Sequence, residues 1–145
     1  MLIQGKCHCG NLSFSLRWEP EPTHIPARVC GCAFCTKHGG VWTSHPDGAL
    51  KIAIREPALL SKYQFGSRTA EFHVCSRCGV VPLVTSLIGG RLYAVVSVNA
   101  FEGVDPHLIR PSAADFDGEA HGDRLSRRAR NWIANVQYSD PGGAQ

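Results

Sequence analysis

Seven cysteines, arranged in three tight groups, are the residues of this sequence best suited to chemistry. The groups are Cys7-His-Cys9, Cys30-Gly-Cys32-Ala-Phe-Cys35 and Cys75-Ser-Arg-Cys78. Thiolates spaced so closely converge on one point, which suits a metal ion better than cross-links spread over a surface. Seven is also an odd number, and Cys-x-Cys neighbours do not bridge easily to each other. We therefore predict zinc binding rather than disulfides.

Two of the groups have the form of a zinc knuckle. In Cys75-Ser-Arg-Cys78, two intervening residues let both sulfurs reach one ion. The glycine that follows can adopt the positive φ that turns backbone N–H groups towards thiolates. Cys7-His-Cys9 is also followed by glycine and is a shorter form of the same knuckle, with one intervening residue. Together the two pairs would provide the four sulfurs of a closed structural zinc site.

The middle group is different, because one short loop carries Cys30, Cys32 and Cys35. Two closed tetrahedral sites of cysteine alone need eight sulfurs, and the chain has seven. One site must therefore take a histidine, a carboxylate or an exogenous ligand. The count does not say which cysteines pair, but the economical partition leaves the middle group incomplete. Three protein ligands and an open position are typical of a catalytic zinc.

A closed site of three cysteines and one histidine is the alternative for the middle group. His38 follows the last of these cysteines by three residues, and His8 and His45 are further candidates. Spacing alone leaves this alternative open, although a single histidine is more often a surface residue than a ligand.

Short strands are expected to position the cysteines. Residues 12–18 and 50–54 alternate apolar with polar side chains, residues 70–74 lead directly into Cys75, and residues 92–98 are rich in β-branched side chains. Gly89-Gly90 predicts the tip of a hairpin. The proline-containing stretch before Arg28 is expected to be irregular.

The last third of the chain has a different character. Residues 105–121 are expected to form a loop, and residues 141–145 a frayed tail. Between them Asp123 is placed to cap a helix with one apolar face, formed by Leu125, Ala129, Trp132, Ile133 and Val136. The other face carries Arg124, Arg127, Arg128 and Arg130. The plain interpretation is a solvated basic surface, and binding of a polyanion is the alternative.

Composition fits one domain with a packed core, since the chain has 145 residues of which 43% are hydrophobic and 19% charged. Seven thiolates with two Zn²⁺ ions contribute −3, which would cancel the formal charge of +3. We therefore expect no nucleic-acid partner. The N-terminus lacks the basic region followed by an apolar stretch that is typical of a signal peptide. The apolar runs of the chain are too short to span a bilayer. We expect a soluble, cytoplasmic protein.

The three cysteine groups, in this order, resemble the glutathione-dependent formaldehyde-activating enzyme (GFA) family, which includes the CENP-V proteins. The likeness is carried by residues 5–10, 30–40 and 72–79 and covers roughly residues 3–110. It implies a mainly β, β-tent fold of short antiparallel sheets around zinc, followed here by the C-terminal helix. It also implies a structural zinc on Cys7, Cys9, Cys75 and Cys78, and a second zinc on Cys30, Cys32 and Cys35 with its fourth position open. We expect residues 1–110 to form the zinc-binding domain and residues 111–145 an extension packed on it.

The family activity is condensation of formaldehyde with glutathione to S-(hydroxymethyl)glutathione, whose reverse is a carbon–sulfur lyase reaction. The resemblance thus implies catalytic Cys30, Cys32 and Cys35, with a small thiol such as glutathione and a small aldehyde as partners. Three thiolates leave the zinc site formally −1, so thiol delivery is a more natural role than activation of water. The alternative is a non-catalytic zinc-binding interaction module, or a zinc or thiol-redox sensor, of the same fold.

Three side chains near the middle group have both a chemical and a structural interpretation. Lys37 is either a partner for a substrate carboxylate or a solvated surface lysine, and His38 is a candidate proton relay. Trp42 belongs either to the site or to the core. Arg28 is expected only to cover apolar surface.

Overall fold

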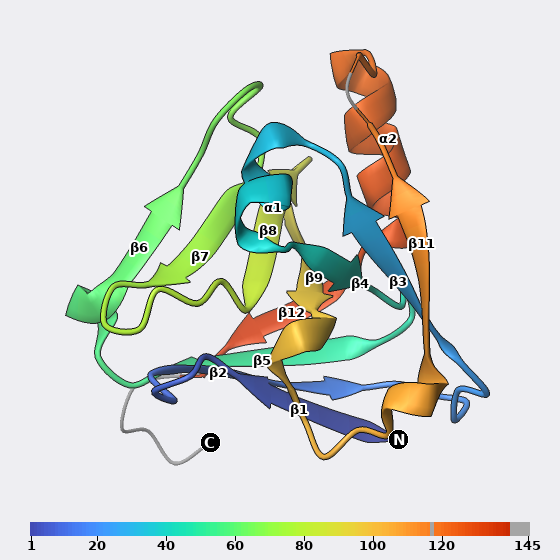
Figure 1. Cartoon of the computed structure of the whole chain (residues 1–145). Coiled ribbons are helices and arrows are strands. Elements are labelled where there is room, and N and C mark those ends of the chain that lie inside the picture. The colour runs from blue at the N-terminus through green and yellow to red at the C-terminus, as the bar shows by residue number, and fades with distance from the viewer. Residues whose placement is uncertain (117, 140–145) are drawn as a thin grey trace.

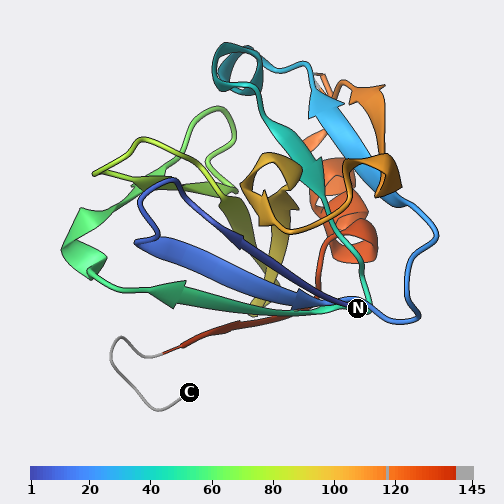
Figure 2. The ribbon, with the colours of Figure 1, turned by 60° about the horizontal axis from the view of Figure 1, so that its bottom comes forward.

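The computed structural model describes residues 1–116 and 118–139, and its fold is mainly β, as the sequence predicts. Two sheets in which antiparallel pairs predominate make up most of it. One sheet runs across the bottom of Figure 1, the other rises above it, and α2 stands beside the second sheet. Figure 2 shows the same two layers from another side. The predicted β-tent architecture with a C-terminal helix is confirmed.

The first sheet has the spatial order β10–β1–β2–β5–β12. Its strands are β1 (Leu2–Lys6), β2 (Leu12–Arg17), β5 (Ala49–Ile54), β10 (Phe101–Glu102) and β12 (Asn135–Tyr138). The second sheet has the order β11–β3–β4–β9–β8–β7–β6. Its strands are β3 (Ile25–Cys30), β4 (Val41–Thr43), β6 (Leu60–Tyr63), β7 (Glu71–Cys75), β8 (Leu83–Ile88), β9 (Arg91–Ser97) and β11 (Ile109–Ala114).

The helices are short and lie outside the sheets. They are α1 (Ala33–His38), α2 (His121–Asn131) and the 3₁₀ turns η1 (Pro57–Leu59), η2 (Val98–Ala100) and η3 (Pro106–Leu108). None of these helices has the length and apolar character that crossing a bilayer would need.

The main core lies between the two sheets. Phe14 and Leu16 of β2 are buried at alternate positions, as the predicted alternation requires, and Ile52 of β5 joins them. They belong to one cluster with Leu83 and Val96 of the second sheet. Burial of each such side chain contributes about 1.5–3 kcal/mol, which holds the two sheets together.

The predicted hairpin at Gly89-Gly90 joins β8 to β9. Their φ angles of 58° and 81° are both left-handed, as a two-residue turn of this kind requires. The turn fixes the register in which Ile88 lies opposite Arg91. This hairpin forms the centre of the second sheet, in which β3 ends at Cys30 and β7 ends at Cys75.

Two segments expected to be irregular form a parallel strand pair instead. Residues 105–121, expected as a loop, contain η3 and β11, and β11 pairs with β3, which begins in the proline-containing stretch. Each strand contains a proline, Pro26 in β3 and Pro111 in β11. Because proline has no backbone N–H to donate to the sheet, its presence weakens the strand pattern in the sequence. The pairing places Ala114 opposite Cys30. The C-terminal segment is thereby held next to the middle cysteine group.

The predicted helix is shorter than expected and begins earlier. Asp123 lies in the first turn of α2 rather than at its cap. Trp132 caps its C-terminal end, Ile133 bridges to Ala94, and Val136 belongs to β12. The apolar spacing fits a longer helix, but the edge of β5 offers backbone partners that the segment takes instead. The tail expected at residues 141–145 lies outside the described residues.

Candidate metal centres

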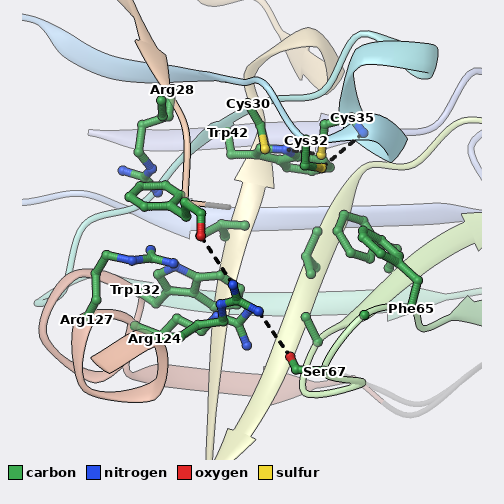
Figure 3. A pocket seen from close by; sticks show the side chains of 18 of the residues that line it. Arg28, Cys30, Cys32, Cys35, Trp42, Phe65, Ser67, Arg124, Arg127 and Trp132 are labelled. Atoms are coloured by element: carbon green, nitrogen blue, oxygen red, sulfur yellow. Dashed lines mark hydrogen bonds between the residues drawn. The ribbon is translucent and has the colours of Figure 1, made fainter. Parts of the chain in front are cut away.

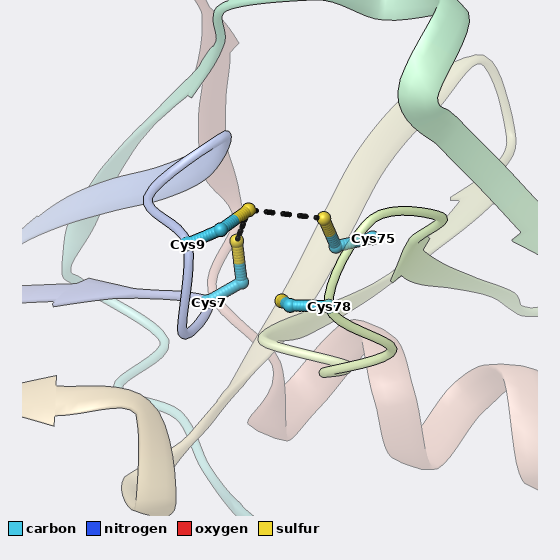
Figure 4. Close-up of side chains that lie close together, drawn as sticks. All are labelled: Cys7, Cys9, Cys75 and Cys78. Carbon is cyan, nitrogen blue, oxygen red and sulfur yellow. Dashed lines mark hydrogen bonds between the residues drawn. The ribbon is translucent and has the colours of Figure 1, made fainter.

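Four cysteines come together at the turns that follow β1 and β7 (Figure 4). Their sulfurs all lie within 4.8 Å of one another. Cys7 Sγ is 3.8 Å from Cys9 Sγ, which is 3.5 Å from Cys75 Sγ. Four sulfurs held about 2.3 Å from a zinc ion form a tetrahedron with edges of about 3.8 Å. The separations fit that edge, so these three residues and Cys78 could hold a zinc ion.

Glycines shape both turns of this four-cysteine site. Gly10 and Gly79 have φ angles of 85° and 80°, which few other residues adopt without strain. Their N–H groups donate to the carbonyl oxygens of Cys7 and Cys75, at 3.1 and 2.7 Å. A backbone N–H also donates to a sulfur, as the knuckle pattern predicts: that of Leu12 to Cys7 Sγ at 3.3 Å.

The thiols of this site differ in acidity. Burial raises the pKa of Cys7 to about 11. Burial also acts to raise the pKa of Cys78, but hydrogen bonds from the backbone N–H groups of Val80 and Cys9 and from the thiols of Cys75 and Cys7 together outweigh it, and that pKa falls to about 6. Four thiolates so close together repel one another, so full ionisation needs a cation among them.

The middle cysteines meet at a corner between a strand and a helix. Cys30 ends β3, Cys32 caps α1 and Cys35 lies within α1, which brings the three sulfurs within 4.8 Å of one another. The Cys35 N–H donates to Cys32 Sγ at 3.3 Å, and Trp42 Nε1–H donates to Cys35 Sγ at 3.4 Å. The interaction with Cys30, together with burial, raises the pKa of Cys35 well above its ordinary value. This group could also hold a metal ion, with three protein ligands.

The histidines considered as a fourth ligand lie elsewhere. Within the described residues, no histidine nitrogen joins the three sulfurs at 4.8 Å or less. The ring of His38 packs against Phe34, with centroids 4.4 Å apart. His45 stacks on Trp18, and His8 is exposed. The alternative of a closed site with one histidine therefore has no described histidine in place.

A cavity of about 470 Å³ opens beside the middle cysteines (Figure 3). Apolar side chains form much of its wall: Trp42, Phe65, Phe72, Val84, Val95, Phe116 and Trp132. Its volume lies within the range of about 300–1,000 Å³ that is usual for small-molecule sites. A small organic ligand can therefore reach these three sulfurs, whereas no residue of the four-cysteine site lines this cavity.

Four arginines also line the cavity: Arg28, Arg124, Arg127 and Arg128. Figure 3 shows Arg124 and Arg127 across the cavity from the cysteines. The expectation of a solvated basic helix face is wrong for three of its four arginines. Arg128 is 9% exposed, and the side chains of Arg124 and Arg127 are 21% and 16% exposed, whereas Arg130 is exposed. Arg124, Arg127 and Arg128 are spaced i, i+3 and i+4, which places them on one face of the helix. This spacing is the feature of the sequence that could have indicated a shared site.

Three other expectations have a clear outcome. Trp42 serves both roles considered for it, because its ring is buried and its N–H donates to a cysteine sulfur. Lys37 is exposed and does not line the cavity. Arg28 does more than cover apolar surface, since it lines the cavity and donates to Ser44 Oγ at 3.0 Å.

Comparisons with known proteins agree with this geometry. Residues 2–118 match the family described as glutathione-dependent formaldehyde-activating enzyme. A search of curated proteins finds no match. A crystal structure of a Rhodobacter sphaeroides protein is similar, with a TM-score of 0.52 and 29% sequence identity over 72% of this chain and 92% of that one. The family match includes all seven cysteines, and the chain therefore belongs to the glutathione-dependent formaldehyde-activating enzyme family.

Proposed function

We propose that this protein is a zinc-dependent carbon–sulfur lyase or synthase that acts on the adduct of a small thiol with a small aldehyde. The model reaction is the formation of S-(hydroxymethyl)glutathione from glutathione and formaldehyde, which the family name suggests. The observation that carries the proposal is the position of Cys30, Cys32 and Cys35 in the wall of the cavity. By contrast, no cysteine of the four-cysteine site lines this cavity, and we assign that group a structural role.

The chain's own groups prepare the catalytic site. Zinc on the middle cysteines would supply an electrophilic centre at which a substrate thiol loses its proton near neutral pH. The N–H groups of Trp42 and Cys35 hold two of the sulfurs in place. Apolar side chains such as Phe72 and Trp132 keep water from the reacting sulfur. In the synthetic direction, that sulfur forms a bond to the carbonyl carbon, and the carbonyl oxygen takes up a proton.

Exchange kinetics test this function directly. NMR would follow the interconversion of glutathione, formaldehyde and their adduct with the zinc-loaded protein. The wild-type protein should accelerate exchange, and Cys35→Ser should abolish the acceleration while the protein stays folded with one zinc ion. A wild-type protein that accelerates the reaction of none of several thiols would instead favour the non-catalytic zinc-binding module or redox sensor.

The location and the domain division follow as parts of the proposal. Reduced cysteines persist in the cytoplasm, where we place the protein. We propose that residues 1–110 form the zinc-binding domain and that residues 111–145 form an extension packed on it. Two contacts support that packing: β12 pairs with β5, and Ile133 bridges to Ala94.

A further inference from the structure

The arginines of the cavity carry more positive charge than the described residues neutralise. Glu119 lies 3.6 Å from Arg124 and 3.0 Å from Arg127, and so partners both. For Arg28 and Arg128, no carboxylate within residues 1–116 and 118–139 forms an ion pair. Among the described residues, Glu119 is the one carboxylate that forms ion pairs with these four guanidinium groups, which together carry a net positive charge.

Arg128 is the most enclosed of these arginines. Its Nη1 donates to Thr69 Oγ1 at 2.8 Å and to Ser86 Oγ at 3.2 Å, and its guanidinium lies 5.0 Å from the centre of the Trp132 ring. Its Nε is buried and has no hydrogen-bond partner in the described part of the chain. Burial lowers the pKa of Arg128 to about 10, which leaves it charged at neutral pH. A buried guanidinium charge that no described carboxylate neutralises is costly, and an anionic ligand in the cavity would lower that cost.

Arg28 lies on β3, two residues before Cys30. Burial lowers its pKa, the charge of Arg127 lowers it further, and Cys30 acts in the opposite direction. Arg28 lines the same cavity as Cys30 and Arg127. Figure 3 shows its side chain reaching from the level of the cysteines towards α2. Its Nη2 donates to Ser44 Oγ, which donates to the Asn131 carbonyl at 2.7 Å and so links Arg28 to the end of the helix.

We propose that Arg28 and Arg128 bind a carboxylate of the thiol substrate, so that the site accepts anionic thiols and discriminates against neutral ones. This inference rests on the proposed function, because it assigns the two ends of one ligand: the sulfur at the middle cysteines and the carboxylate at the α2 side. Guanidinium groups match the planar geometry of a carboxylate. A small aldehyde carries no charge, so the arginines act on the thiol. Arg128 lies outside the family match at residues 2–118, and family membership does not account for it.

The carboxylate end can be tested without the thiol reaction. S-methylglutathione keeps both carboxylates of glutathione but has no free thiol, so its binding reports on the anion site. Calorimetric titration of the zinc-loaded full chain should show binding that Arg28→Gln and Arg128→Gln each weaken about ten-fold or more, the effect of losing a charge-assisted hydrogen bond. Arg130→Gln is the matched control, because Arg130 is an exposed arginine of the same helix that does not line the cavity. It should leave the affinity unchanged.

Two further measurements separate the outcomes. Esterification of both carboxylates of S-methylglutathione should weaken binding to the wild-type protein at least as much as Arg28→Gln does. If Arg128→Gln does not fold, Arg28→Gln decides alone, since within the described part of the chain the hydrogen bond that it removes is the one to Ser44. An affinity for S-methylglutathione that is unchanged in the folded arginine variants, or unchanged by esterification, would overturn the proposal.

The carboxylate site and the proposed function can fail independently. If the arginine variants lose S-methylglutathione binding while the wild-type protein accelerates no thiol–aldehyde reaction, the carboxylate site stands and the proposed function is wrong. If the wild-type protein accelerates the reaction and anion binding does not depend on the arginines, the proposed function stands and this inference is wrong.

Discussion

Cys78→Ser would remove one of four sulfurs that join the turn after β1 to the turn after β7. The apolar cluster beneath these turns is small, and Cys7, Leu12 and Cys75 are its buried members. Structural zinc contributes about 10–16 kcal/mol to small zinc domains, which is as large as the net stability of about 5–15 kcal/mol of a typical domain. Shared equally by four sulfurs, this gives a cost of about 2.5–4 kcal/mol for the loss of one.

The assay combines thermal unfolding with the zinc content of the purified protein. A loss of about 2.5–4 kcal/mol corresponds to a Tm lower by about 10 °C for a domain of this size. Cys35→Ser is the matched control, because it makes the same chemical change in the group beside the cavity. We expect it to retain one zinc ion per chain and to unfold within a few degrees of the wild-type protein. Equal losses of Tm in the two variants, or a wild-type protein with a single zinc ion, would refute the division into structural and catalytic sites.

Three further predictions concern the metal, the packing beside it and pH. A chelator should remove one zinc ion faster than the other, because the cavity gives access only to the middle group; release of both ions in one phase would contradict this. Gly40→Ala would place a methyl group 2.9 Å from Cys35 Cβ and 3.0 Å from its sulfur, so it should cost about 1–3 kcal/mol in unfolding free energy and speed the loss of that ion. Gly122→Ala, which meets nothing within 4 Å, is its control and should stabilise the helix by about 0.5–1 kcal/mol. Burial lowers the pKa of His73 from 6.5 to about 4, so between these pH values the unfolded chain binds a proton that the folded protein does not. Stability should therefore fall by up to about 3 kcal/mol as pH drops through this window, and chemical denaturation should show a shallower pH dependence for His73→Gln.

The metal groups could be predicted from sequence because their chemistry is local. Two residues between Cys75 and Cys78 already limit where the two sulfurs can meet, and a glycine after each pair supplies the required turn. The strands at residues 12–18 and 92–98 were equally accessible, since alternation and β-branching report burial directly. In these places local pattern and tertiary structure agree.

The wall opposite the cysteines could not be predicted in this way, because its position depends on pairing between distant segments. Arg110 of β11 lies opposite Pro26 of β3, and neither proline-containing strand has a clear pattern of its own. Only when that pair has formed does the chain after Ala114 lie beside Cys30. From the sequence alone, a charged side chain such as Arg128 is expected to be exposed to solvent. Its burial requires hydrogen-bond acceptors from elsewhere in the chain, which Thr69 before β7 and Ser86 in β8 provide.

Part of the proposed carboxylate site lies on a different element from the metal ligands. The middle cysteines and Arg28 lie within residues 2–118, the part of the chain that matches the family, whereas Arg124, Arg127, Arg128 and Trp132 lie beyond it. A change in α2 that leaves β11 and the cysteines intact can alter the charge of the cavity without moving a metal ligand. Substitutions at Arg128 should therefore change which thiol is bound far more than they change zinc content. A variant in which both properties fall together would show that the α2 wall and the metal site act as one unit.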